Sequence, residues 1–128
     1  MLAIRSHATT ALPKSMTLGE HQELFMRLLP RLIDKAHELG FEIRGGDLFR
    51  DARSHGKLGE RIAYGNAFSC HKVKLAIDLN LFKDGEYIST TEGHRELGEW
   101  WESRHDLCCW GGRFKDGNHY SLTYQGMK

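Results

Sequence analysis

The chain lacks the long apolar segments that membrane proteins and secreted precursors carry. None of its hydrophobic runs approaches the ~18 consecutive apolar residues of a membrane-spanning helix. Its first fifteen residues, MLAIRSHATTALPKS, also contain no continuous apolar stretch of the kind found in a secretion signal. We therefore expect a protein without a membrane span, synthesised in the cytoplasm without a signal peptide. If it acts on the bacterial cell wall outside the cytoplasm, something else, such as a separate pore, must release it.

An excess of charge of one sign is also absent. Eighteen Lys and Arg residues stand against seventeen Asp and Glu residues, and the net charge is +1 with neutral histidines. Non-specific nucleic-acid binding requires clustered cations that neutralise many phosphates, and the sequence contains no basic stripe. We therefore expect no nucleic-acid partner.

Cysteine and proline are scarce. The three cysteines form no Cys-x-x-Cys pair, and two of them are adjacent, so the sequence predicts neither a disulfide framework nor a zinc ribbon. The two prolines mark no linker, and no internal repeat is visible. Hydrophobic content of 40% and charged content of 27% are typical of globular proteins. We expect one domain over residues 1–128, in which residues 1–15 form a loose N-terminal arm.

Two amphipathic helices and several short strands are predicted. A capping box at Thr17 and Glu20 begins a helix over 18–39, which ends before Gly40. A second helix is predicted over 91–104. Strands are predicted over 41–44, 74–82, 87–88, 108–110 and 119–123, with a hairpin turn over 83–85. This order favours an α+β fold with a small antiparallel sheet, and the glycine-containing stretch 47–70 is expected to be a functional loop.

Asp78 is the first candidate functional residue because it interrupts an otherwise apolar strand, on the face opposite the leucines. A carboxylate there needs hydrogen bonds, a cation or a metal. The alternative to a metal ligand is an exposed strand face or an ion pair with Arg50. His71 can reach the same metal only if the turn before the strand folds back, and His119 opens another strand. Two histidines and one carboxylate, with a position left for water, are typical of a catalytic zinc site. Asp116 could then take a proton from the zinc-bound water.

Two segments resemble the signatures of one enzyme family. Residues 69–78, SCHKVKLAID, resemble the pattern Ser-x-His-x-x-Gly-x-Ala-x-Asp, and residues 110–120, WGGRFKDGNHY, resemble Trp-Gly-Gly followed by an acid, two residues and His-aromatic. Both patterns belong to the D-alanyl-D-alanine carboxypeptidase and L-alanyl-D-glutamate endopeptidase family of zinc peptidases. The segment 46–51 resembles that family's aromatic-Arg turn, so the resemblance covers about residues 41–121. Segments 78–85 and 97–102 are most similar to short phage members that serve as endolysins.

The resemblance implies a small antiparallel sheet with flanking helices, the hedgehog/D-Ala-D-Ala zinc peptidase-like fold, and one Zn²⁺ per chain. Lys74 stands where the family has Gly, so we expect an ordinary backbone dihedral and a slightly altered turn there. The implied roles are zinc ligands for His71, Asp78 and His119, general base for Asp116, carbonyl or oxyanion binding for Arg50, and hydrogen bonding to substrate or within the site for Ser69.

The sequence therefore predicts a monomeric zinc metallopeptidase that hydrolyses an amide bond of the peptidoglycan stem peptide, as a phage endolysin does. The bond is either L-alanyl-D-glutamate or a terminal D-alanyl-D-alanine. The alternative is a non-catalytic, zinc-stabilised binding module on the same scaffold. A His-metal finger nuclease is disfavoured because the net charge is nearly neutral.

The remaining histidines, cysteines and tryptophans are assigned structural roles. His21 and His37 are expected at the surface or core edge of the first helix, and the other histidines in loops or on helix surfaces. A nucleophilic role for Cys70 is disfavoured because neighbouring residues in a strand point opposite ways. Trp110 fits either a structural position or the wall of a cleft. Packing in or beside the core is predicted for Trp100, Trp101, Cys108 and Cys109.

Overall fold

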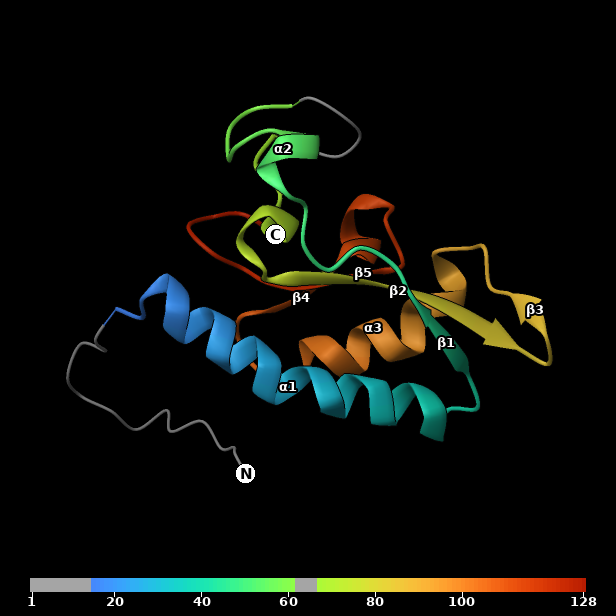
Figure 1. The fold of residues 1–128 in the computed structure, drawn as a ribbon. Helices are drawn as coiled ribbons and strands as arrows, with labels where there is room; N and C mark the ends of the chain where they lie inside the picture. Colours follow the sequence, from blue (N-terminus) through green and yellow to red (C-terminus); the bar gives the residue numbers. More distant parts are fainter. Residues whose placement is uncertain (1–14, 62–66) are drawn as a thin grey trace, which may run out of the picture.

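The structure is a computed structural model that describes residues 15–61 and 67–128, so nearly all of the predicted N-terminal arm lies outside the described residues. Helices, 3₁₀ turns and short strands are interspersed along the chain (Figure 1). In order they are α1 (Leu18–Glu38), β1 (Glu42–Gly45), α2 (Ala52–His55), the 3₁₀ turn η1 (Cys70–Val73), β2 (Ala76–Lys83), β3 (Glu86–Tyr87), the 3₁₀ turn η2 (Glu92–His94), α3 (Arg95–Glu102), β4 (Cys108–Trp110), the 3₁₀ turn η3 (Gly111–Phe114) and β5 (His119–Leu122).

The five strands form one antiparallel sheet. Its order is β1-β2-β5-β4, and β3 pairs with β2 through the predicted hairpin. Helices α1 and α3 lie on one face of the sheet, whereas α2, η1 and η3 lie on the other (Figure 1). The predicted α+β fold with a small antiparallel sheet is confirmed for the described part of the chain.

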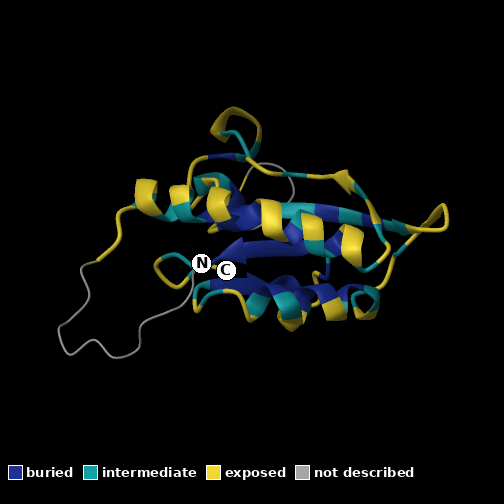
Figure 2. Ribbon diagram, turned by 90° about the horizontal axis from the view of Figure 1, so that it is seen from below, coloured by how far each residue is buried: buried dark blue, intermediate teal, exposed yellow. Residues whose placement is uncertain are grey.

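The hydrophobic core lies between the sheet and the two long helices. The capping box predicted at Thr17 and Glu20 is present, and α1 turns an apolar stripe toward the strands. Figure 2 shows this division, with buried residues along the strands and α3 and exposed residues along the outer side of α1. The ring of Phe25 meets that of Trp101 edge-on, with centroids 6.2 Å apart. Each large apolar side chain buried here contributes roughly 1.5–3 kcal/mol.

Several local predictions differ from the structure, mostly at the ends of elements. The second helix begins as the 3₁₀ turn η2, and α3 ends at Glu102 rather than Arg104. The strand predicted from residue 74 begins at Ala76 because Lys74 adopts a left-handed conformation. Residues 70–73 form a 3₁₀ turn rather than an extended entry into that strand. In the described part of the 47–70 stretch, the only α-helical element is α2, which Asp51 caps.

No helix in the described ranges combines the length and the apolar composition that crossing a bilayer requires.

Candidate metal centre

Strand pairing brings Asp78 and His119 together. They are directly opposite each other in the antiparallel β2–β5 register, and directly opposed residues project from the same face of a sheet. On β5 the neighbours of His119 alternate, so that Tyr120 and Leu122 belong to the core. Asp78 and His119 therefore share the face away from α1 and α3, where the alternation of β2 predicted that Asp78 would lie.

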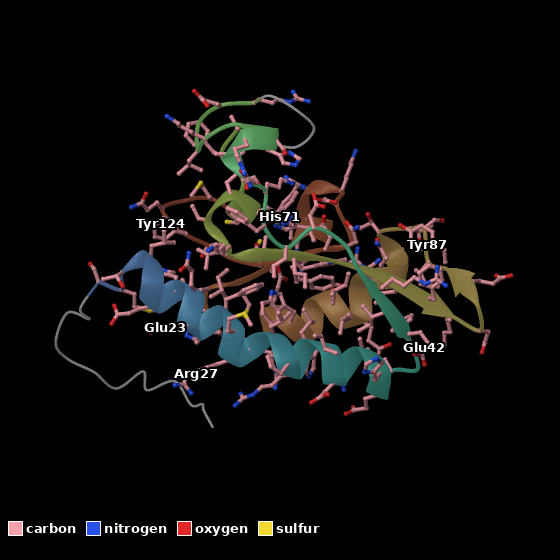
Figure 3. All side chains as sticks on the ribbon, viewed as in Figure 1. Glu23, Arg27, Glu42, His71, Tyr87 and Tyr124 are labelled. Atoms are coloured by element: carbon pink, nitrogen blue, oxygen red, sulfur yellow. The ribbon has the colours of Figure 1, made fainter. Side chains whose placement is uncertain are left out.

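A fold-back turn brings His71 to the same place. Turn η1 ends at Lys74, whose φ of 62° and ψ of 36° are left-handed, and the amide of Leu75 donates to the carbonyl of Cys70 at 2.9 Å. The expectation of an ordinary dihedral at Lys74 is wrong: lysine takes the conformation that glycine adopts more easily. The chain thus reverses before β2, and Figure 3 shows His71 on the face of the sheet away from α1.

His71, Asp78 and His119 form a compact triad. The distance from His71 Nε2 to Asp78 Oδ1 is 3.2 Å, and that from His119 Nδ1 to Asp78 Oδ1 is 3.9 Å. The imidazole rings lie edge to face with centroids 5.2 Å apart. Each residue offers one ligand atom within 4.8 Å of the other two, so the group could hold one metal ion.

Unpartnered polar atoms show that the triad fits a metal. His71 Nε2, Asp78 Oδ1 and His119 Nε2 are buried without a hydrogen-bond partner, although burying such atoms unpaired costs free energy. The short His71–Asp78 distance does not satisfy hydrogen-bond geometry, because Nε2 and Oδ1 both remain unpaired. A cation between His71 Nε2 and Asp78 Oδ1 would compensate their desolvation, and His119 faces Asp78 through Nδ1 rather than through the unpartnered Nε2. Two imidazoles with one carboxylate are ligands that zinc accepts.

The electrostatic environment favours neutral imidazole at His119. Burial, followed by the nearby His71, lowers the pKa of His119 to about 4. Metal ligation requires an unprotonated ring nitrogen. A histidine that is already neutral at pH 7 therefore does not have to release a proton when a cation binds.

The segment 46–50 continues from β1 along the backbone of Asp78 and then contacts His71. The Leu48 carbonyl lies 3.4 Å from His71 Nδ1, and the Arg50 amide donates to the His71 carbonyl at 3.1 Å. A carbonyl acceptor at Nδ1 favours the tautomer that leaves Nε2 free for a metal. Gly46 allows this close approach to Asp78, since a Cβ there would lie 3.0 Å from Asp78 Cβ.

Arg50 and Ser69 are joined in a polar network beside His71. Arg50 Nε donates to Asp47 Oδ2 at 3.1 Å, and its Nη1 donates to Ser69 Oγ at 3.2 Å. Ser69 is buried, and its Oγ also accepts from the His71 amide, which caps η1. Ser69 therefore makes the hydrogen bonds of a positioning residue within the site. Asp51, the other acid beside Arg50 in sequence, pairs with Arg53.

Asp116 lies beside His119 and is more exposed to solvent than the triad. Its Oδ2 is 3.9 Å from His119 Nδ1, and its side chain is 52% exposed against 5% for His119. Partial burial and the negative charge of Asp78 raise the pKa of Asp116 above its ordinary value. The turn that places it is tight: the Asp116 amide donates to the Gly111 carbonyl at 2.8 Å, and a Cβ on Gly111 would meet the Asp116 carbonyl oxygen at 2.2 Å.

Trp110 anchors this turn from the core side. The indole is fully buried, and its Nε1 donates to the Gly117 carbonyl at 2.7 Å. Gly98 and Gly112 lie against the ring so closely that a Cβ on either would come within 2.4 Å of it. The structure thus places Trp110 in the core. Gly112, the second glycine of the Trp-Gly-Gly motif, is needed because a side chain there would collide with the indole.

His94 is placed differently from its prediction. It is 2% exposed rather than on a helix surface, and its Nδ1 lies 2.8 Å from the hydroxyl of Tyr120. Nothing near His94 in sequence indicated this partner, which lies on β5.

Cys70 is buried with its pKa raised to about 12 by burial, which opposes a nucleophilic role. The predicted packing positions are confirmed for Trp101, Cys108 and Cys109, which are buried, and for Trp100, which packs against the core.

Replacing His94 by Gln should reduce the acid sensitivity of the metal-free protein. Burial lowers the pKa of His94 to about 4 from an ordinary value of 6.5. The unfolded chain therefore binds more protons below about pH 6.5, and the free energy of unfolding falls as the pH drops toward 4. His94 and His119 each account for a loss on the order of 3 kcal/mol.

Urea denaturation in the presence of a chelator, near pH 7 and near pH 4.5, measures this difference. His94→Gln should show about half the wild-type loss of stability on acidification. His37→Gln, on the exposed side of α1, should retain the full loss. An unchanged pH dependence in His94→Gln would contradict the assignment.

Comparison with known proteins adds no relative. A scan against protein-family models finds no match to the chain, and a search of curated proteins finds no significant match. The structure itself shows a buried His-Asp-His triad that could bind a metal. Because no relative was found, the resemblance of the two motifs to the zinc peptidase family stays a prediction.

Proposed function

We propose that the protein is a zinc-dependent peptidase that hydrolyses an amide bond of the peptidoglycan stem peptide, in the manner of a phage endolysin. The observation that carries the proposal is the arrangement around the triad. Three buried ligand-type atoms lack partners, and the half-exposed carboxylate of Asp116 lies 3.9 Å from one of the histidines. The two motifs that resemble the zinc peptidase family contain all four residues.

Each residue has a chemical task in such a reaction. Zinc, held by His71, Asp78 and His119, would lower the pKa of a water and polarise the scissile carbonyl. Asp116 accepts a proton from the attacking water and delivers it to the leaving amine, and its raised pKa suits a group that must both take and give a proton. Arg50, held by Ser69 and Asp47, supplies a fixed positive charge for the oxyanion.

The position of Asp116 also favours an enzyme over a zinc-stabilised binding module. A structural zinc site is closed by four protein ligands, whereas a catalytic site has three and leaves one position for water. In this chain the ligand-type atoms are buried, whereas the neighbouring carboxylate reaches solvent.

Arg50→Lys tests whether the guanidinium contributes geometry to the reaction. Lysine retains the charge but cannot bind Ser69 and Asp47 through separate nitrogens as Arg50 does. We expect zinc content and fold to be unchanged and turnover to fall ~10²–10³-fold, the cost of a lost oxyanion donor. Arg53→Lys, an exposed ion-pair change on α2, is the matched control. Near-normal turnover in Arg50→Lys would show that Arg50 acts only through its ion pair with Asp47.

The proposed function is tested by incubating purified peptidoglycan with the zinc-loaded protein and measuring the masses of the released fragments. We expect new amino and carboxyl termini within the stem peptide, and no release when zinc is removed by a chelator. Peptidoglycan that is bound but never cleaved, with zinc in place, would favour the binding module.

A further inference from the structure

One carboxylate at the end of α3 binds the segment that leads to the metal centre. Glu102 is the last residue of α3, whereas Arg113 belongs to η3, on the other face of the sheet (Figure 1). Glu102 Oε1 accepts hydrogen bonds from Arg113 Nη2 at 2.7 Å and from Arg113 Nε at 3.1 Å. Glu102 Oε2 accepts from the Trp110 amide at 3.0 Å. The two oxygens therefore join α3 to the end of β4 and to η3.

The bond to the Trp110 amide lies at the edge of the sheet. β4 is the last strand in the order β1-β2-β5-β4, and the outer backbone groups of an edge strand have no neighbouring strand to bind. Glu102 supplies the acceptor for the Trp110 amide, the last amide of β4, and this bond is partly buried. Loss of the carboxylate would leave the donor unpaired, an effect that a surface ion pair alone does not have.

The segment between Trp110 and His119 is bound to itself as well. Trp110 Nε1 donates to the Gly117 carbonyl at 2.7 Å, and the His119 amide donates to the Asp116 carbonyl at 3.1 Å. Because the indole and the amide of Trp110 belong to one residue, Glu102 and Gly117 are linked through it. A shift at Trp110 would therefore displace Asp116 relative to the triad.

Arg113 acts on the same residue from the side of its ring. Arg113 Cζ lies 5.5 Å from the centroid of the Trp110 ring, within the distance at which a guanidinium is attracted to an indole. Glu102 thus binds the Trp110 amide directly and also binds the cation that contacts the Trp110 ring. We expect Glu102 and Arg113 to act as one unit on Trp110.

We propose that Glu102 is a positioning residue for the reaction, which acts on Asp116 through Trp110 and Arg113. This inference rests on the proposed peptidase function. A general base must lie within hydrogen-bond reach of the proton that it accepts, and a misplacement of about 1 Å can lower a rate about 10²-fold. The bonds of Glu102 go to Trp110 and Arg113 rather than to the triad, so Glu102 governs turnover and not zinc binding.

Steady-state kinetics of Glu102→Ala on solubilised peptidoglycan fragments, followed by the release of amino groups, tests this role. The variant should retain about one zinc per chain and lose ~10–100-fold in kcat, with KM changed less than about twofold. Glu102→Gln keeps an acceptor for the Trp110 amide and should lose less. The matched control is Glu99→Ala, which removes an exposed ion pair with Arg95 on the same helix and should retain wild-type kcat. Wild-type kcat in Glu102→Ala, or a loss of zinc that matches the loss of kcat, would overturn the proposal.

A double-mutant cycle tests whether Glu102 acts together with Arg113. Arg113→Ala should lower kcat less than Glu102→Ala does, because the bond from the Trp110 amide to Glu102 remains. The double variant should lose no more than Glu102→Ala alone, since both changes remove the same ion pair. Losses that multiply in the double variant would contradict action as one unit.

Amide hydrogen exchange of the metal-free protein, followed by NMR, tests the hold on the segment without catalysis. In Glu102→Ala the amides of Trp110 and Asp116 should exchange about tenfold faster, as expected for the loss of a hydrogen bond, whereas the amides of the β1–β2 pairing should not change. Unchanged exchange at Asp116 would overturn the proposal whatever the activity. A wild-type protein that cleaves no peptidoglycan would instead overturn the proposed function, and the exchange rates would still decide whether Glu102 holds this segment.

Discussion

His71→Ala, Asp78→Ala and His119→Ala should each abolish stoichiometric zinc binding. The wild-type protein is expected to hold about one zinc per chain, because one group of three ligand-type atoms is brought within 4.8 Å in the described residues. A tetrahedral site that already leaves one position for water cannot lose a protein ligand and keep its affinity. The loss should exceed the 10–100-fold decrease that is typical when only an outer-shell hydrogen bond is removed.

Elemental analysis after dialysis against a limiting chelator measures this effect. The matched controls are His37→Ala and Asp34→Ala, two changes of the same chemical type on the exposed side of α1. Circular dichroism of each variant separates a lost ligand from a lost fold, and Asp78→Asn offers a change of the same size if the alanine variant is unstable. Full zinc occupancy in all three ligand variants would contradict the assignment.

Asp116→Asn should retain zinc and fold but lose ~10²–10⁴-fold in peptidoglycan hydrolysis, the contribution of a general base. The substitution preserves size and removes the proton acceptor. Because the side chain is half exposed, a large loss of stability is not expected. Asp84→Asn, on the exposed hairpin turn, is the control for the chemical change alone.

Zinc content and turnover must be measured on the same preparation of Asp116→Asn, because two different results would contradict the assignment. Loss of zinc would make Asp116 a ligand and remove one member of the proposed triad. Wild-type turnover with full zinc would mean that another group takes the proton.

Alternation within β2 predicted the face on which Asp78 lies, but not its neighbour. The pairing of Asp78 with His119 depends on the β2–β5 register, which joins strands that are distant in sequence and which local periodicity does not determine. Residue types alone suggested that the two residues share a metal site, and the resemblance of the two motifs supplied the stronger reason to group them. The capping box of α1, by contrast, is a local signal and appears as predicted.

The turn at Lys74 shows where a local rule fails. A lysine normally avoids positive φ, so the sequence favoured an altered turn. In the structure the Lys74 amide donates toward the Cys70 and His71 carbonyls, and the reversal brings His71 back to Asp78. Tertiary contacts compensate a conformation that costs roughly 1–2 kcal/mol.

His94 was misplaced for a related reason. It stands among polar residues at the start of the second predicted helix, and such a pattern predicts a surface position. Its partner Tyr120 follows 26 residues later and meets it only when β5 has joined the sheet. The core position of Trp110 likewise depends on its close approach to Gly98, a tertiary contact that the local sequence pattern does not indicate.

Stepwise addition of zinc to the metal-free protein, with peptidoglycan hydrolysis followed in the same sample, tests the proposed peptidase most directly. The proposal predicts that the rate rises in proportion to zinc and reaches its limit at about one equivalent per chain. Hydrolysis that proceeds equally well without zinc, or no hydrolysis after one equivalent has bound, would contradict it.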